Sequence, residues 1–353
     1  FFEVSSGASI RGSMTLLDRV LWTSVLVVFV SGLFNFIIHY VLGLQHLTCL
    51  GGLGTVKPLV EHQFARDVSY VFSVTQQLEK MTTKYQLVEV FAHAYLGNIL
   101  VIDQSVQITE KDEANYHEMM VHVPLAYMPK AKKVLMIGGG DGGAVFRALQ
   151  HDHIEHAALV DIDMRTMREI SRKYFSMLYQ AYTDPRTVAY SFDGAEWLED
   201  QLADEANHGT YELIMADTTD YGAASSLFTD HFYAGLKRLM HPETSILVLN
   251  VDSPSWNMDT VIGVQRQLST MFKYAYIYHT HQPTFLSGHY SFLFASNNID
   301  PMTAPIDWSE WHRKKIPTYY YTPEIHYASF MLPAMVSRHL TMSGRLSSVT
   351  TFP

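Results

Sequence analysis

The chain has 353 residues, of which 48% are hydrophobic, so it can bury a large core in two or three structural units and is not a disordered protein. Its formal net charge of −10 provides none of the basic surface that nucleic-acid binding requires, and it suits a cationic ligand. A single cysteine, Cys49, excludes an internal disulfide bond and any zinc site built on cysteines.

An uncharged apolar segment dominates the first part of the chain. Residues 20–56 contain no Asp, Glu, Lys or Arg, and the segment up to Leu44 is dense in Leu, Val, Ile and Phe. A helix needs about 20 apolar residues to cross a bilayer. This length disfavours a buried core helix, and the absence of a small-residue cleavage pattern disfavours a signal peptide. We expect a tail (1–18), a transmembrane helix (19–45) that anchors the chain in a membrane through residues 20–44, and a single-pass topology.

A linker and a β-rich region follow the apolar segment. Gly51-Gly-Leu-Gly54 and Pro58 lie in a predicted linker over residues 46–60. Two strand-like runs come next, Tyr85 to Phe91 and Asn98 to Asp103, and the short segment between them favours an antiparallel pair. The sequence therefore predicts a small β-rich domain over residues 61–115.

The next region alternates strands and helices. A strand over 133–137 runs into Gly138-Gly-Gly-Asp-Gly-Gly143 and then into a helix over 144–151. Free backbone N–H groups at such a helix N-terminus face a ligand. A second apolar strand ends at Asp161, about 20 residues beyond the glycines, where an acid can bind ribose hydroxyls. The glycine turn and Asp161 together indicate a nucleoside ligand, although an ordinary strand-to-helix turn can contain the same glycines.

Later buried strands also end in polar residues. Thr187 to Phe192 is followed by Asp193-Gly194, and Tyr211 to Ala216 is followed by Asp217. Parallel strands bring such ends to one edge of a doubly wound α/β sheet, which is the expected ligand site. We expect an α/β domain over residues 116–340 and a C-terminal tail over residues 341–353.

Asp141 lies inside the glycine turn, where a carboxylate would repel a pyrophosphate, so a cationic ligand is expected there. The six residues of this turn, Gly138-Gly-Gly-Asp-Gly-Gly143, resemble the signature of spermidine synthases. These aminopropyltransferases use decarboxylated S-adenosylmethionine as co-substrate. The resemblance implies a methyltransferase-like Rossmann domain preceded by a β-rich domain, without a metal or prosthetic group. Asp141 would favour the ammonium group of that co-substrate over the carboxylate of ordinary S-adenosylmethionine.

The resemblance extends over about residues 68–340. Tyr85-Gln86 resembles the pair that opens a strand in the family's β domain, and Tyr116 to Met119 resembles its Tyr-x-Glu-Met motif. Asp217-Thr-Thr-Asp220 resembles the family's Asp-Ser-Ser-Asp, whose first acid is the proposed base. Taken alone, such a pair of acids at a strand end is more often a capped turn with solvated side chains. The neighbouring motifs favour the catalytic interpretation.

The resemblance implies a role for each candidate residue. Asp217 would be the catalytic base, and Tyr116 and Asp220 would hold the acceptor, a polyamine. The 18 histidines show no metalloenzyme spacing, so no metal ligand is predicted. The nucleoside and its propylammonium arm would be held by Gln86, Gln107, Gly138, Gly139, Gly140, Asp141, Gly142, Asp161, Asp193 and Gly194.

The departures from the family pattern lie mainly on the acceptor side. Phe285 stands where the family has a substrate-facing Tyr, Gln104 replaces a Gly, Tyr221 replaces a Pro, and Asn250-Val-Asp252 replaces Gln-Gly-Glu. Three interpretations stay open: an active aminopropyltransferase, a catalytically idle accessory subunit of a membrane complex, and an S-adenosylmethionine-dependent methyltransferase. The anchor would suit a membrane such as the mitochondrial inner membrane, and complex subunits or a homo-oligomer would be the protein partners.

Overall fold

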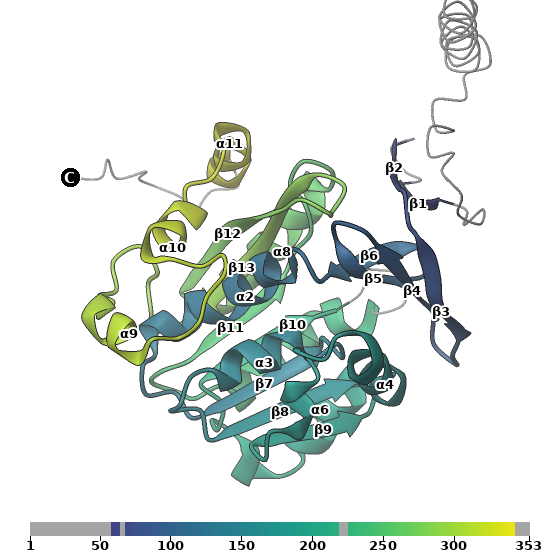
Figure 1. Ribbon diagram of the computed structural model, residues 1–353. Coiled ribbons are helices and arrows are strands. Elements are labelled where there is room, and N and C mark those ends of the chain that lie inside the picture. The colour runs from purple at the N-terminus through teal and green to yellow at the C-terminus, as the bar shows by residue number, and fades with distance from the viewer. Residues whose placement is uncertain (1–57, 64–67, 219–224, 343–353) are drawn as a thin grey trace, which may run out of the picture. The chain divides into compact units, whose positions relative to one another are not determined.

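The structure of the protein is a computed structural model that describes residues 58–63, 68–218 and 225–342 (Figure 1). The predicted N-terminal tail, the predicted transmembrane helix and most of the linker lie outside the described residues, as do Asp220 and Tyr221. Within the described residues, no helix is both long enough and apolar enough to cross a membrane. The anchor over residues 20–44 stays a prediction from the sequence.

An antiparallel β-rich region comes first, as expected. Its strands are β1 (Leu59–Gln63), β2 (Val68–Phe72), β3 (Gln76–Thr82), β4 (Leu87–His93), β5 (Gly97–Ile102) and β6 (Ser105–Thr109). β1 pairs with β2, and a separate four-stranded sheet has the order β3-β4-β5-β6. The prediction of an antiparallel pair over 85–91 and 98–103 is confirmed by β4 and β5. Their residues are apolar on both faces because one face packs on Ile170 of helix α4 (Met164–Tyr174) and the other packs on Leu59.

A seven-stranded sheet forms the centre of the α/β region. Its strands are β7 (Lys133–Gly138), β8 (His156–Asp161), β9 (Thr187–Ser191), β10 (Leu213–Asp217), β11 (Ile246–Asn250), β12 (Tyr274–Gln282) and β13 (Gly288–Ser296). Their order is β12-β13-β11-β10-β7-β8-β9. The five strands from β11 to β9 are parallel, and β13 runs antiparallel to both of its neighbours. The carboxyl ends of β7, β8, β10 and β11 therefore meet at one edge.

Helices cover both faces of this sheet, so the inner parallel strands β7, β8, β10 and β11 are buried along most of their length, whereas the edge strand β9 is largely exposed. The helices are α2 (Glu113–Tyr127), α3 (Gly143–Leu149), α5 (Gln180–Thr183), α6 (Gly194–Leu202), α7 (Asp230–Leu239), α8 (Met258–Met271), α9 (Trp308–Lys314), α10 (Pro323–Ser329) and α11 (Ala334–Met342), with short 3-10 turns at Glu205–Asn207 and Ser225–Phe228. In β7, Val134 and Met136 pack with α2 and α3, whereas Leu135 and Ile137 pack with α6, α7 and α8.

The prediction of a methyltransferase-like α/β domain after a β-rich region is confirmed, with two corrections at its boundaries. β1 begins at Leu59, so the predicted linker over residues 46–60 overlaps the first strand. The predicted boundary between residues 115 and 116 falls inside α2, which begins at Glu113. The helix starts ahead of the Tyr-x-Glu-Met motif because the carbonyl of Asp112 already accepts a hydrogen bond from the N–H of Asn115.

Candidate active site

The glycine turn joins β7 to α3 and lies against the end of β10. Gly138, the last residue of β7, is in register with Asp217, the last residue of β10. Gly138 has a φ of +76°, and a Cβ atom added to it would lie 2.0 Å from the backbone oxygen of Asp217. Only glycine fits this position without displacing backbone. The turn therefore brings the predicted nucleoside site directly against the predicted base.

Asp141 is the buried acid of this turn, with an exposed fraction of 9%. Its Oδ1 accepts a hydrogen bond of 2.7 Å from the N–H of Gly143 and lies 3.4 Å from Nε2 of His117. Burial raises the pKa of the Asp141 carboxyl group, and the nearby His117 acts in the opposite direction. The carboxylate is thus held by the first N–H group of α3 and by one basic side chain.

His117 begins a chain of buried charged side chains that the sequence analysis did not find. Its Nδ1 lies 2.7 Å from Glu113, Glu113 binds Arg147, and Nη1 of Arg147 lies 3.3 Å from Glu118. Burial opposes a charge on His117, but the carboxylates of Asp141 and Glu113 outweigh it and raise the pKa of the imidazole. With every group charged, the three carboxylates exceed the two cations by one negative charge. A cationic ligand beside Asp141 would balance it.

Asp161 lies at the end of β8, next to the same turn. Its Oδ2 accepts a hydrogen bond of 3.1 Å from the N–H of Gly140, and its Oδ1 accepts one of 2.7 Å from the N–H of Asp163. Burial raises the pKa of Asp161 to about 6. The amide of Gln86 reaches this corner by donating to Oδ2 of Asp163 at 3.1 Å. The structure therefore brings Gln86, Gly140 and Asp161 together.

The remaining nucleoside candidates make local contacts. Oδ1 of Asp193 accepts hydrogen bonds from the N–H groups of Ala195 and Glu196, so this side chain caps α6, in which Gly194 is the first residue. The amide of Gln107 donates to the carbonyl of Ser105 within β6 at 3.2 Å. Asp193 thus caps α6 just after the carboxyl end of β9, and the side chain of Gln107 is engaged within its own strand.

Asp217 is held by two donors from different elements. Its Oδ1 accepts a hydrogen bond of 2.6 Å from the hydroxyl of Tyr116 and one of 3.1 Å from Nδ2 of Asn250. Burial raises the pKa of Asp217 to about 6. Burial and the neighbouring carboxylate raise the pKa of Tyr116 well above its usual value, so this phenol keeps its proton and donates. The carboxyl group is therefore ionised near neutral pH and can take up a proton under mildly acidic conditions.

Aromatic rings surround Tyr116, and one of them belongs to Phe285, which departs from the family pattern. The ring centroid of Tyr116 lies 5.9 Å from that of Phe285, 5.6 Å from that of Tyr290 and 4.9 Å from that of Phe292. Contacts of this kind stabilise a ring in one orientation. They fix the position of the hydroxyl group that donates to Asp217.

The chain is similar to known proteins in sequence and in fold. The family model described as Spermine/spermidine synthase domain matches residues 113–304. The chain belongs to the spermine/spermidine synthase family. A polyamine aminopropyltransferase of Lachnoclostridium phytofermentans is 32% identical over 281 residues, which cover 79% of this chain and 96% of that protein. The polyamine aminopropyltransferase of Bacillus subtilis is 35% identical over 273 residues, covering 77% and 95%. A crystal structure of spermidine synthase in complex with the transition-state analogue AdoDATO has a TM-score of 0.77 at 29% identity, covering 84% of this chain and 99% of that one.

The resemblance to spermidine synthases is thus confirmed, and the structure places most departures from the family pattern. Phe285 joins the rings around Tyr116, and Asn250 binds Asp217. Gln104 instead lies exposed in the turn between β5 and β6. Asp220 and Tyr221 lie outside the described residues.

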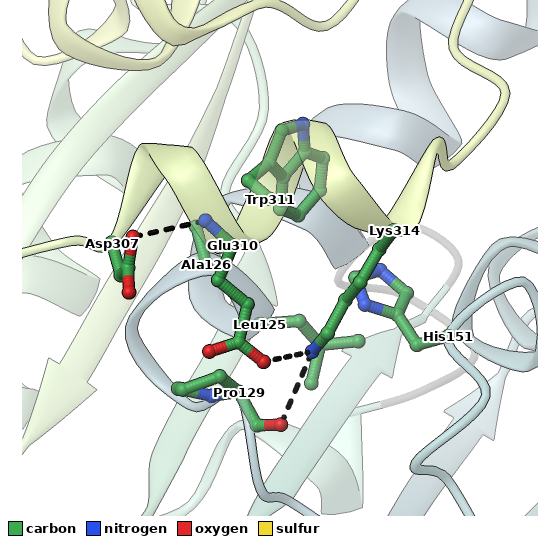
Figure 2. Close-up of a pocket in the computed structure, with 8 residues that line it drawn as sticks. All are labelled: Leu125, Ala126, Pro129, His151, Asp307, Glu310, Trp311 and Lys314. Atoms are coloured by element: carbon green, nitrogen blue, oxygen red, sulfur yellow. Dashed lines mark hydrogen bonds and ion pairs between the residues drawn. The ribbon is translucent and has the colours of Figure 1, made fainter.

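A pocket lies at the C-terminal end of α2, and none of Asp141, Asp161 and Asp217 lines it. Figure 2 shows the ammonium group of Lys314 between the carboxylate of Glu310, 3.4 Å away, and the carbonyl of Pro129, 3.3 Å away. His151 lies beside it and pairs at 3.0 Å with His122, whose pKa burial lowers to about 3. Over the part of the chain that the structure describes, no group of His, Cys, Asp and Glu could hold a metal ion. The pocket is lined by Leu125, Ala126, Pro129, His151, Asp307, Glu310, Trp311 and Lys314.

Proposed function

We propose that this chain transfers an aminopropyl group from decarboxylated S-adenosylmethionine to an amine of a polyamine. The observation that carries the proposal is the setting of Asp217. Its carboxyl group lies beside the glycine turn, is held through Oδ1 by Tyr116 and Asn250, and has a pKa that burial raises to about 6. A general base works best when its pKa lies near the working pH.

The proposed reaction is a direct displacement at carbon. The acceptor nitrogen forms a bond to the propyl carbon attached to the sulfonium, and the carbon–sulfur bond breaks. The electron pair of that bond returns to sulfur, which leaves as neutral methylthioadenosine, and the proton of the nitrogen passes to Asp217. The protein's contribution is to align the two partners and to accept this proton.

The nucleoside would bind at the glycine turn. Asp161, which accepts a hydrogen bond from the N–H of Gly140 in the turn ahead of α3, would accept hydrogen bonds from the ribose hydroxyls. The ammonium arm of the co-substrate would lie beside Asp141, where the buried charges lack one positive charge. A related spermidine synthase binds the transition-state analogue AdoDATO, which supports this assignment. No prosthetic group is part of the proposal.

The two alternative interpretations gain no support from the site. A methyltransferase would place the carboxylate of S-adenosylmethionine near Asp141, and the two negative charges would repel each other. An idle accessory subunit has no need of a half-buried carboxylate at Asp217 with two hydrogen-bond donors. Removing a carboxylate from water costs folding free energy, so its presence at this position favours a function for it.

The test is a transfer assay with radiolabelled decarboxylated S-adenosylmethionine and with putrescine, spermidine and longer amines as acceptors. The full chain should transfer label to at least one amine. Asp217→Asn should lower kcat by about a hundredfold or more because the proton acceptor is lost. Its affinity for methylthioadenosine should change little, since Asp217 lies on the acceptor side.

Asp200→Asn is the matched control for that assay, because Asp200 lies exposed on α6 and the same change of charge occurs there. It should leave the transfer rate unchanged. Absence of transfer to every amine by the unmodified chain would overturn the proposal. Full activity in Asp217→Asn would assign the base to another group.

The membrane assignments remain part of the proposal. We infer from the uncharged apolar run that residues 20–44 cross a membrane once, with the mitochondrial inner membrane as the candidate location. Removal of residues 1–55 should then release the protein from membranes into the aqueous fraction after fractionation of cells. Equal partitioning of the full and shortened chains would contradict the anchor. Partner subunits and a homo-oligomer would be sought by cross-linking of the full chain.

A further inference from the structure

Asn250 bridges the candidate base and the backbone that follows it. It is the last residue of β11, which pairs in parallel with β10 so that Leu249 lies opposite Ala216. Its Nδ2 donates to Oδ1 of Asp217 and to the carbonyl of Thr218, both at 3.1 Å. Its side-chain oxygen Oδ1 accepts a hydrogen bond of 3.4 Å from the N–H of Thr218. One amide therefore contacts both the carboxylate and the next residue of the chain.

We propose that Asn250 is a positioning residue for Asp217: with Tyr116 it fixes Oδ1 of the carboxylate, so that Oδ2 accepts the proton of the acceptor amine. This inference rests on the proposed function. Tyr116 and Asn250 both donate to Oδ1, and no described residue donates to Oδ2. Two donors that approach one oxygen from α2 and from β11 oppose rotation of the carboxylate about its terminal bond.

The contacts of the amide determine its orientation. Nδ2 lies near two oxygen atoms, and the amide oxygen faces an N–H group. The reversed orientation would bring the oxygen of Asn250 against Oδ1 of Asp217 and against the carbonyl of Thr218. Replacement by a carboxylate would produce the same repulsion and add a charge. The position therefore requires a side chain that is neutral and can donate and accept.

Fixing one oxygen also separates the two oxygens chemically. Hydrogen bonds to Oδ1 stabilise the negative charge of the carboxylate and make that oxygen a weaker proton acceptor. Oδ2 becomes the more basic atom, and its direction is set by the geometry at Oδ1. A reactive nitrogen must lie within hydrogen-bond distance of this oxygen for the proton to pass in line with the attack.

Asn250→Leu tests the role because leucine keeps the branched four-atom skeleton of the asparagine side chain and cannot donate a hydrogen bond. We expect kcat to fall by about tenfold or more, and the acidic limb of the profile of kcat/KM against pH to move up by about one pH unit. The affinity for methylthioadenosine should stay within about twofold of the original value. Asn250→Gln keeps the amide, so the acidic limb of its profile of kcat/KM against pH should lie closer to that of the unmodified chain.

Asn298→Leu is the matched control, since the side chain of Asn298 is bonded to the carbonyl of Pro242 away from the acids. It should leave the profile in place. A lower melting temperature for Asn250→Leu with an unmoved limb would show a structural role and overturn the inference. So would a limb that moves equally in Asn250→Leu and Asn250→Gln.

A second measurement separates this inference from the proposed function. The pKa of Asp217 can be followed by carbon-13 NMR of the side-chain carboxyl carbon, with Asp217→Asn for assignment and without turnover. If the unmodified chain transfers no aminopropyl group, the proposed function fails, yet a higher pKa in Asn250→Leu would still support the contact. An unchanged pKa of Asp217 would overturn the role of Asn250 whatever the assay shows.

Discussion

The proposed nucleoside half and the proposed acceptor half of the candidate site are constructed in different ways. The nucleoside half comes from one continuous stretch, residues 138–143, followed by the next strand end at Asp161. The acceptor half joins Tyr116 of α2, Asp217 of β10 and Asn250 of β11. The proposed nucleoside half therefore depends on local backbone conformation, whereas the proposed acceptor half depends on the packing of elements that are distant in the sequence.

The central acids of the two halves, Asp141 and Asp217, also lie in different surroundings. Asp141 is buried and Asp217 is half-buried, and desolvation raises the pKa of both carboxyl groups. Asp141 lies beside the basic His117 and at the end of a chain of charges, whereas Asp217 accepts hydrogen bonds from two neutral donors, Tyr116 and Asn250. This arrangement suits Asp141 to hold a cation and Asp217 to take up a proton.

The largest expected effect concerns pH and the acceptor half. The pKa of Asp217 lies at about 6, so the fraction in the ionised, proton-accepting form falls as the pH drops below that value. We expect kcat/KM for the acceptor amine to fall by about tenfold for each pH unit below 6, since this quantity reports the free enzyme. Initial rates of label transfer between pH 4.5 and 8 measure it. A profile that stays flat down to pH 5 would remove Asp217 from the role of base.

The next effect concerns the nucleoside half. Asp141 should disfavour S-adenosylmethionine, which carries a carboxylate, relative to methylthioadenosine, which carries none. In Asp141→Asn we expect the ratio of the two affinities to move by about tenfold towards S-adenosylmethionine, because the repulsion is removed. Calorimetric titration of both ligands measures the ratio.

Asp200→Asn again controls for the loss of one negative charge on an exposed surface, and it should keep the original ratio. Stronger binding of S-adenosylmethionine than of methylthioadenosine by the unmodified chain would contradict this use of Asp141. It would favour the methyltransferase interpretation for the nucleoside half.

The features that the sequence could predict are local, whereas those that it could not predict join distant elements. The order of strands and helices, the glycine turn and Asp161 were predictable because each is a local pattern of apolar residues and glycines. The chain from His117 to Arg147 was missed because it joins α2 to α3. Its available signal was the spacing of Glu113 and His117, four residues apart on one helix face. The bond from Asn250 to Asp217 depends on the register of β10 and β11, which no single motif contains.

Gln104 departs from the family pattern, but it is not among the residues that surround Tyr116 and Asp217. The sequence analysis groups it with the acceptor-side departures, but it lies exposed in a two-residue turn in which Ile102 pairs with Ser105. Asp103 and Gln104 have φ values of +47° and +70°, the left-handed region that such hairpin turns use. Its effect should therefore be on folding stability rather than on the choice of amine.

Gln104→Gly is the smallest of the predicted effects. Glycine removes the steric cost of a side chain at positive φ, and its greater freedom in the unfolded chain offsets part of the gain. We expect the free energy of unfolding to rise by roughly 0.5 to 1 kcal/mol, measured by urea denaturation, with the transfer rate unchanged.

Gln107→Gly supplies the matched comparison, because the same substitution occurs in β6 at a residue without positive φ. Glycine inside a strand should lower the free energy of unfolding by roughly 0.5 to 1 kcal/mol, so the two variants should differ in sign. If both variants lose stability, the left-handed conformation of Gln104 does not destabilise the turn. If Gln104→Gly instead alters which amine is used, Gln104 acts on the acceptor half, and the boundary drawn between the two halves must move to include the β5–β6 turn.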